Sequence, residues 1–330
     1  MEPPAPAPIV DSGGVDDPEV KRFLFPDGAL KPAWKSPAPL DRIPEPWRGR
    51  MTARRYRRWR HASRGVERHN ARLPRDAPTL NFFPMRPQPH APVSLMLRRL
   101  GVRIGYEPGA ANATIAWDGD TYFSGRAARR LPADAINGRC LDISKSVVDA
   151  AWHEVAGRSL TVDPRTTRTD IVMKPEDNGR HGGRVIQGPI DRPKKGWVYQ
   201  RLVDWREGDW VRQTRAVLIG GRIILVYEKW RRYPDRFFGT RLTLPRDPSR
   251  LYSSEEQARL LEFAARIGMD YGELDVLRDP LDGQIYVVDA NRTPSYPHEL
   301  PAEYEEAAFG PMTEAFRALI GLQGNPDRPV

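Results

Sequence analysis

The sequence predicts an α/β protein made of two or three packed lobes. The chain has 330 residues, 39% of them hydrophobic and 29% charged, which is enough for several lobes that share an interface. Strand and helix patterns follow one another between residues 76 and 200, as expected for an α/β arrangement. The second half instead contains paired strand patterns joined by turn residues, which indicate antiparallel hairpins with helices packed behind them.

Composition excludes several classes of protein. No apolar run reaches the length needed to span a bilayer, and the first residues, MEPPAPAPIVDSGG, lack the basic and apolar regions of a secretory signal. The single cysteine, Cys140, excludes an internal disulfide framework and a thiolate metal cluster, and we expect it to be a small buried side chain. We therefore expect a soluble protein of the cytoplasm with no membrane partner.

Much of the net charge of +9 is concentrated in Arg48–Arg75, where eight closely spaced arginines interleave with Tyr56 and Trp59. Clustered arginines neutralise phosphates, so nucleic acid or another anionic partner is one interpretation of this segment. A solvated helix or arm is favoured, because arginine is frequent throughout the chain, and a contact between subunits of a homo-oligomer is a third interpretation.

The N-terminal part reads as a Pro/Arg-rich arm. Residues Met1–Trp47 are rich in proline and lack periodicity, so we expect mostly extended or disordered chain. A short segment, Glu19–Phe25, has apolar residues that can pack against the body. Thr52–Leu73 has a narrow apolar stripe at helical spacing and predicts a basic helix that ends at Pro74.

A small α/β unit is expected next. Thr79–Met85 is a buried-strand pattern, and Val93–Leu100 is a helix pattern that ends at Gly101. Val102–Tyr106 and Ala113–Trp117 are further strand patterns.

A helix with a lysine at its start follows. Lys145–Ala156 has a helical pattern, Asp142 or Ser144 is available as its N-cap, and Gly157 is suited to end it. A lysine at a helix N-terminus opposes the helix dipole, so either a bound anion or ordinary surface exposure accounts for Lys145.

A strand, a lysine and a glycine-bearing loop come next. Thr169–Lys174 predicts a strand, the loop reads EDNGRHGG, and Arg184–Ile190 begins as a returning strand. A P-loop needs Gly-x-x-x-x-Gly-Lys-Ser/Thr before a helix, so this is a different arrangement. Glycines let backbone N–H groups approach phosphates, and Lys174 would supply a point charge; a plain hairpin is the alternative. Trp197–Val203 is a further strand leading toward a hinge.

A long hairpin is predicted around Gly220-Gly221, between Val211–Ile219 and Arg222–Trp230. The alternation places Gln213 and Arg215 on one face of it. Three cations at its end would favour an anionic substrate, although plain surface charge explains them equally well: Lys229, Arg231 and Arg232.

Two helices and one loop complete this half. Pro234–Ser253 reads as a loop in which Phe237-Phe238-Gly239 is a candidate gate. Ser254–Gly268 is the clearest helix, with Ser253 or Ser254 as its cap and Glu256 or Gln257 in its first turn. Glu303–Leu322 is a final helix, with an interruption expected at Gly310-Pro311.

The stretch that most constrains function is a late hairpin. Gly272–Arg278 and Gln284–Ala290 predict two antiparallel strands joined by a turn at residues 279–283. If Arg278 pairs with Gln284, Asp275 faces Val287 and lies diagonal to Asp289, within roughly 7–8 Å on the same face. Asn291 follows on that face. Two carboxylates and an amide oxygen suit a hard cation such as Mg²⁺, which keeps waters and takes phosphates as further ligands. Solvated acids at strand ends are the alternative.

This hairpin, ending Asp289-Ala290-Asn291 with Thr293-Pro294 behind it, resembles the C-terminal metal-binding signature of the ATP-grasp superfamily. The resemblance extends in the same order over Leu141–Pro297. It implies two lobes that clamp a nucleotide, preceded by a small α/β domain. One departure is Asp289, where most amide-forming members have Glu; a shorter carboxylate is also found in ATP-grasp-like kinases.

The resemblance implies a domain organisation and a set of roles. The expected boundaries are residues 1–75 for the Pro-rich and basic extension, 76–140 for the pre-ATP-grasp domain, 141–204 for the N-terminal lobe and 205–325 for the C-terminal lobe. The implied phosphate ligands are Lys145, Lys174 and Arg215, of which Lys174 and Arg215 are the catalytic candidates. The implied nucleoside contacts are Gln200, Gln213 and the backbone of Leu202 and Val203. The implied Mg²⁺ ligands are Asp275, Asp289 and Asn291.

The implied activity is that of a ligase. ATP with Mg²⁺ phosphorylates a carboxylate, and an amine or similar nucleophile then displaces phosphate from the acyl-phosphate. The substrates would be small molecules or peptides, and the sequence does not identify them. A small-molecule kinase on the same scaffold is the first alternative, and a nucleic-acid-binding protein that uses the arginine-rich segment is the second.

Overall fold

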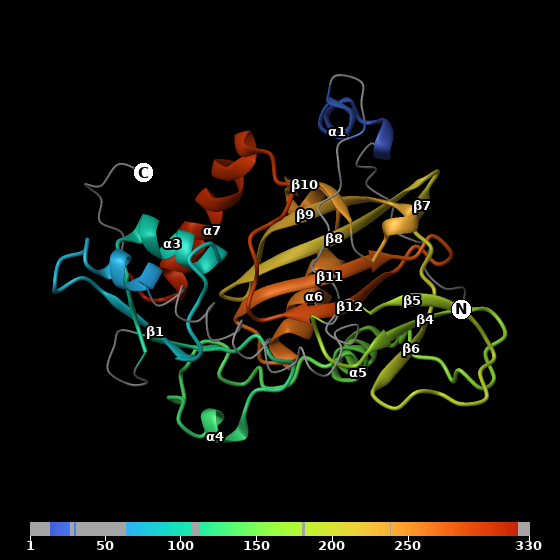
Figure 1. Ribbon diagram of the computed structural model, residues 1–330, viewed down its shortest axis with the longest axis horizontal. Helices are drawn as coiled ribbons and strands as arrows, with labels where there is room; N and C mark the ends of the chain where they lie inside the picture. Colours follow the sequence, from blue (N-terminus) through green and yellow to red (C-terminus); the bar gives the residue numbers. More distant parts are fainter. Residues whose placement is uncertain are drawn as a thin grey trace, which may run out of the picture.

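The computed structural model describes residues 14–26, 30, 64–106, 113–179, 182–237 and 239–322. Three β-sheets with their helices make up this part of the chain, and Figure 1 shows the largest sheet in the middle with a smaller one on each side. Most of the predicted Pro/Arg-rich arm, including the arginines of residues 48–63, lies outside the described residues. Within the described residues, none of the helices is both long and apolar enough to cross a membrane.

The first sheet is parallel and confirms the predicted small α/β unit. Its central strand β1 (Thr79–Pro84) lies between β2 (Arg103–Gly105) and β3 (Ala113–Trp117). Helix α3 (Pro92–Leu100) ends where Gly101 takes a left-handed conformation with φ of 68°. The short helix α4 (Gly125–Ala128) follows β3.

The second sheet has the order β5-β4-β6 and is antiparallel. Strands β4 (Asp170–Pro175), β5 (Arg184–Gln187) and β6 (Trp197–Arg201) contribute to it, as predicted. On β4, Ile171 and Met173 belong to a small hydrophobic cluster on one face. Because side chains alternate along a strand, Val172 and Lys174 project from the opposite face.

The third sheet has the order β10-β9-β8-β11-β12, with β7 beside β8. Its strands are β7 (Arg206–Glu207), β8 (Trp210–Ile219), β9 (Arg222–Arg232), β10 (Thr240–Arg246), β11 (Tyr271–Arg278) and β12 (Ile285–Asn291). The predicted turn joins β8 to β9, and both of its glycines have positive φ, 59° at Gly220 and 70° at Gly221. Two consecutive residues with positive φ are typical of a tight hairpin turn.

Helices cover both faces of this sheet. Helices α5 (Lys145–Ala156) and α6 (Ser254–Arg266) pack on one face, where Trp152 and Phe263 meet edge to face. Helix α7 (Glu305–Leu319) and the first sheet pack on part of the other face, through Phe316 against Tyr271. The rest of that face is turned toward the second sheet.

The N-terminal segment is anchored on the third sheet, as predicted for Glu19–Phe25. Helix α1 (Pro18–Leu24) buries Val20 and Leu24 completely, in a cluster with Trp210 and Trp230. Figure 1 shows this helix beside the β9–β10 edge. Of the predicted basic helix, residues 64–70 are helical and the preceding part lies outside the described residues.

Two expectations about secondary structure were wrong. The segment Pro234–Ser253 contains the edge strand β10, whose Leu242 and Leu244 are fully buried. Helix α7 is continuous through Pro311, without the expected interruption. The large side chains that α7 buries beyond the proline, Met312 and Phe316, stabilise it through tertiary packing. Short 3₁₀ helices complete the described structure: Gly14–Asp16, Tyr233–Asp235, Pro248–Arg250 and Ala302–Tyr304.

Candidate active site

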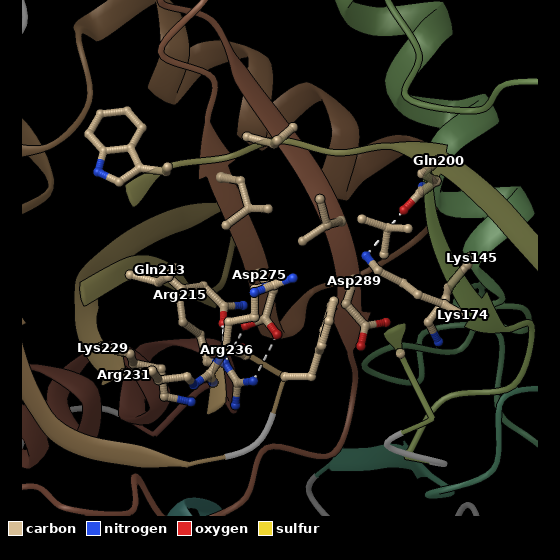
Figure 2. A pocket seen from close by; sticks show the side chains of 18 of the residues that line it. Lys145, Lys174, Gln200, Gln213, Arg215, Lys229, Arg231, Arg236, Asp275 and Asp289 are labelled. Atoms are coloured by element: carbon tan, nitrogen blue, oxygen red, sulfur yellow. Dashed lines mark hydrogen bonds and ion pairs between the residues drawn. The ribbon is translucent and has the colours of Figure 1, made fainter. Parts of the chain in front are cut away.

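A cavity of about 530 Å³ lies between the second and third sheets. Its volume is within the range of small-molecule sites. The predicted nucleotide and metal ligands that line it are Lys145, Lys174, Gln200, Leu202, Val203, Gln213, Arg215, Asp275 and Asp289. Asn291 is the one predicted site residue that is absent from this lining among the described residues. Figure 2 shows these polar side chains converging from the two sheets.

The late hairpin places two carboxylates directly opposite each other. Asp275 on β11 pairs with Asp289 on β12, whereas Val276 pairs with Val287, so a β-bulge leaves Val288 as the extra residue. The expected register, with Asp275 facing Val287 and Arg278 facing Gln284, was therefore wrong; Arg278 pairs with Ile285. The bulge brings the two carboxylates closer than a diagonal pair.

Asn291 lies at the end of this hairpin, across from Glu273. Its Oδ1 accepts a hydrogen bond from the backbone N–H of Thr293 at 3.0 Å. The amide thus shapes the turn that leaves β12, and its role as a metal ligand stays a prediction.

Arg215 is held by two carboxylates. Its Nε and Nη2 donate to the two oxygens of Asp275 at 2.5 and 2.9 Å, and its Nη1 donates to Glu273 at 3.1 Å. Burial raises the pKa of Asp275, but the Arg215 guanidinium outweighs burial and holds it at about 2. Asp275 is therefore ionised throughout the physiological range.

Glu273 is a buried member of the site that sequence reasoning missed. Its side chain is 2% exposed, and burial raises its pKa even though Arg215 and Lys229 lower it. The signal was available, because Glu273 and Asp275 are two residues apart on one strand and so share a face.

Asp289 faces two lysines, Lys174 of the second sheet and Lys145 of helix α5. In Figure 2 its carboxylate lies between Asp275 on one side and Lys174 and Lys145 on the other. Burial raises its pKa, and Lys145 acts in the opposite direction. Among the described residues, its only hydrogen-bond donor is the N–H of Ala290, at 3.2 Å. A buried carboxylate needs a cation or donors, so Asp289 has capacity left for a ligand.

The two lysines come from different elements. Lys174 of β4 donates to Gln200 Oε1 at 3.1 Å. Burial and the nearby Lys145 lower the pKa of Lys174 to about 8. Lys145 begins α5, is 8% exposed, and donates to the Asp177 carbonyl and to Asn178 Oδ1 at 3.2 and 2.9 Å. Both ammonium groups are bound to neutral oxygens.

Asn178, at the base of the glycine-bearing loop, was also missed. Besides accepting from Lys145, its Nδ2 donates to the carbonyls of Ile143 and Ala290, both at 3.0 Å. Its backbone N–H donates to Thr121 Oγ1 at 2.7 Å. One side chain therefore connects the start of α5, the glycine-bearing loop and the hairpin that carries Asp289. No sequence pattern marks an asparagine with this role.

The remaining walls are apolar side chains and loops. The apolar part of the lining includes Leu160, Val172, Val203, Leu277 and Val288. The loops of the two sheets come close together across the cavity. Gly183, from the loop of the second sheet, lies so near Phe237, from the third, that a Cβ atom added to this glycine would be 3.0 Å from the phenyl ring. Phe237 belongs to the segment predicted as a gate, and Phe238 lies outside the described residues.

The three cations at the end of β9 point to opposite faces of the sheet. Lys229 and Arg231 line the cavity, whereas Arg232 projects from the other face and pairs with Asp209 at 2.8 Å. Burial, followed by the charge of Arg215, lowers the pKa of Lys229 to about 7. Of the three predicted cations, two therefore belong to the site.

No protein-family model matches the chain, and no curated protein matches it in sequence. Several solved structures resemble it. The ATP-grasp ligase PsnB, complexed with minimal precursor, Mg and ADP, has a TM-score of 0.50 and 15% identity, over 73% of this chain and 96% of PsnB. The D-cycloserine synthetase DcsG has a TM-score of 0.46 and 15% identity, over 73% and 99% of the two chains. The L-amino acid ligase from Bacillus licheniformis has a TM-score of 0.42 and 12% identity, over 67% and 68%.

Proposed function

We propose that this chain, which has an ATP-grasp fold, is an ATP-dependent ligase that joins a carboxylate to an amine or similar nucleophile. The observation that supports this most is the pairing of Asp275 with Asp289 opposite two lysines, Lys174 of the second sheet and Lys145 of α5. PsnB, the solved structure of TM-score 0.50, is an ATP-grasp ligase that was complexed with a precursor, Mg and ADP.

The nucleotide would lie between the two sheets. The apolar side chains of Leu160, Val172 and Val288 form walls suited to a base, and the backbone of Leu202 and Val203 borders the same space. Gln200 would recognise the base and Gln213 the ribose. Gln200 is 2% exposed, and its bond to Lys174 fixes its orientation.

The donor set fits Mg²⁺. Asp275 and Asp289 offer carboxylate oxygens on one surface, and Asp289 has few donors of its own. Magnesium accepts one or two carboxylates and completes its shell with waters and phosphates, so no third acid is required. Asn291 is the proposed third ligand. When bound, the ion would polarise the phosphate oxygens and neutralise charge.

The basic side chains would hold the phosphates. Lys174 approaches from the second sheet, Lys145 from the start of α5, and Arg215 and Lys229 from the third sheet. A carboxylate oxygen of the substrate attacks the terminal phosphorus, ADP leaves, and an acyl-phosphate results. The amine then attacks the acyl carbon, and phosphate leaves with its bonding electrons. The protein contributes positioning and charge neutralisation.

Arg215 is suited to the charge that develops in these steps. It projects into the cavity beside Asp275, and its fixed position means that little reorganisation is needed during reaction. If Asp275 turns toward a metal ion, Glu273 still holds the guanidinium through Nη1. Arg215 and Lys174 are accordingly the proposed catalytic side chains.

A trapping assay tests this function. Full-length protein, Mg²⁺ and ATP would be incubated with pooled carboxylic acids, with hydroxylamine as the nucleophile. We expect a hydroxamate and one equivalent of inorganic phosphate, because hydroxylamine intercepts an acyl-phosphate. A kinase would instead give a phosphorylated hydroxyl compound without hydroxamate. Failure to consume ATP with any pool of acids, or consumption independent of acid, would contradict the ligase assignment.

A further inference from the structure

Two arginines at one end of the cavity have only neutral partners. Arg231 donates through Nη1 to Gln213 Oε1 and to the Arg236 carbonyl, and through Nε to Thr240 Oγ1. Arg236 donates through Nη1 to the Tyr233 carbonyl at 3.0 Å, and its buried Nε has no hydrogen-bond partner. Among the residues that the structure describes, neither guanidinium forms an ion pair.

The other arginines that line the cavity are balanced by acids. Arg215 is paired with Asp275 and Glu273, and Arg201 is paired with Asp279. Both side chains are partly buried, and a charge held away from water without a counter-charge is unfavourable, so a cavity that retains two such arginines favours an anionic ligand beside them. Burial lowers the pKa of Arg231 to about 10, which still leaves it charged at neutral pH.

Arg231 and Arg236 lie away from two of the proposed phosphate ligands, Lys145 and Lys174, whereas Lys229 is close to Arg231 on the same strand. Arg231 is on β9 and Asp289 is on β12, three strand spacings apart in the sheet, or roughly 14 Å between their backbones. Figure 2 shows Lys145 and Lys174 on the side of Asp289 that faces away from Arg231 and Arg236. Phosphates held by those lysines would leave Arg231 and Arg236 free for another anion.

We propose that Arg231 and Arg236 bind a second anionic group of the carboxylic-acid substrate, distinct from the carboxylate that is activated. The substrate class is then a diacid or a phosphorylated acid. A guanidinium presents several N–H donors in a plane, and carboxylate and phosphoryl oxygens both match that geometry. This inference rests on the proposed ligase function, because that function supplies the reacting carboxylate.

The alternation of side chains along β9 provides a matched control. Arg232 is next to Arg231 in sequence, but it projects from the opposite face and pairs with the exposed Asp209. Replacing Arg232 removes the same charge from the same strand without altering the cavity. Arg231→Gln and Arg236→Gln retain hydrogen-bonding capacity while removing the charge.

The experiment is calorimetry on full-length protein saturated with Mg²⁺ and a non-hydrolysable ATP analogue. The probes are succinate, glutarate and adipate as diacids, phosphonoacetate as a phosphorus oxyacid, and propionate and butyrate as monoacids. We expect at least one diacid or phosphonoacetate to bind more tightly than the monoacids. Arg231→Gln and Arg236→Gln should each weaken that binding by about 10- to 100-fold, the effect of losing a charge-assisted contact. Arg232→Gln should leave it within about twofold.

Three results would overturn the proposal. The first is that no doubly anionic probe binds better than the monoacids. The second is that the variants weaken monoacid and diacid binding by the same factor, which would assign the arginines to the reacting carboxylate. The third is that they weaken the ATP analogue as much as Lys174→Gln does, which would assign them to the phosphates. The probe type that binds more tightly, diacid or phosphonoacetate, identifies whether the second anion is a carboxylate or a phosphoryl group.

These titrations, together with the hydroxamate assay, separate this inference from the proposed function. If the wild-type protein binds the magnesium–nucleotide complex and forms hydroxamate, but shows no preference for a second anion, only the inference fails. If it neither binds the nucleotide nor forms hydroxamate, the ligase assignment itself fails.

Discussion

Lys174 illustrates how burial tunes a single residue of the cavity. Its ammonium group is bound to one neutral oxygen, that of Gln200, and lies near a second lysine. Burial and Lys145 lower its pKa from 10.5 to about 8, while Asp289 and Asp275 act in the opposite direction. Because an unfolded lysine binds its proton up to about pH 10.4, this group makes the protein more stable as pH rises from about 8 toward that value.

Nucleotide affinity should have the opposite pH dependence. Phosphates bind the charged lysine, so the affinity for MgADP should fall as pH rises above about 8, by up to tenfold per pH unit. Calorimetry between pH 7 and 9.5 measures this, because the phosphates of ADP are fully ionised above pH 8. Lys174→Arg keeps its charge and should flatten the dependence above pH 8, whatever its absolute affinity, leaving only the part due to Lys229, whose pKa is about 7. An unchanged pH profile in that variant would show that another group titrates.

Asn178 is the second residue whose role follows from its contacts. Both N–H groups of its amide donate to backbone carbonyls, and its amide oxygen accepts from Lys145. Asn178→Ala should therefore release Lys145 and weaken the contact to the hairpin at Ala290. We expect kcat/KM for ATP to fall about tenfold or more, since losing buried hydrogen bonds costs roughly 1–3 kcal/mol.

Asn70→Ala is the matched control for Asn178. Asn70 also donates to one carbonyl and accepts from one backbone N–H, both of Ile104, but it ends the helical residues 64–70 and contacts the first sheet, not the cavity. It should lower stability without changing kcat/KM beyond the effect of unfolding. Comparable kinetic losses in both variants would show that Asn178 acts only through general stability.

At the scale of elements, local signals in the sequence were sufficient where turn or cap chemistry is explicit. Ser253 and Glu256 form a full capping box at the start of α6, as their spacing indicated. Gly220-Gly221 joins β8 to β9, and Gly157 ends α5 with φ of 70°. Each of these local structures favours particular residue types: glycine where φ is positive, and serine followed by glutamate where a helix begins with a capping box.

The capping box supports a stability prediction. Ser253→Ala removes the side chain that accepts from the Glu256 N–H, and should lower the free energy of unfolding by about 1 kcal/mol, within a range of 0.5–2. Urea unfolding measures the change. Ser254→Ala, at the exposed next position, should change stability by less than about 0.5 kcal/mol. Equal effects of the two substitutions would contradict the capping role.

Features that depend on contacts between elements were not predictable. A β-bulge sets Asp275 opposite Asp289. It changes the alternation of polar and apolar residues along the strand so little that the sequence pattern does not distinguish it from regular strand pairing. Strand β10 contains Pro245 and two arginines, which favour a loop; as an edge strand it tolerates them, and Arg246 is paired with Glu228 and Glu19.

At the scale of the whole molecule, the cavity exists because the second sheet faces part of the third sheet, which brings together residues far apart in the sequence. The second sheet contributes Lys174 and Gln200, and the third contributes Arg215, Asp275 and Asp289. Residue types and order in the sequence were sufficient to nominate the nine nucleotide and metal ligands that line it, together with Lys229 and Arg231. Asn178 and Arg236 emerge only when loop position and missing counter-charges are known.

The central claim is that Asp289 serves phosphoryl transfer through a metal ion, while base and ribose contacts hold the nucleotide independently. Asp289→Asn keeps the size of the side chain and removes its charge. The measurement compares hydroxamate formation with MgADP affinity in this variant, with the exposed Asp134→Asn as the control. We expect turnover to fall roughly 100-fold or more and affinity to fall by less than about tenfold. Turnover that persists, or turnover and affinity that fall by the same factor, would contradict the claim.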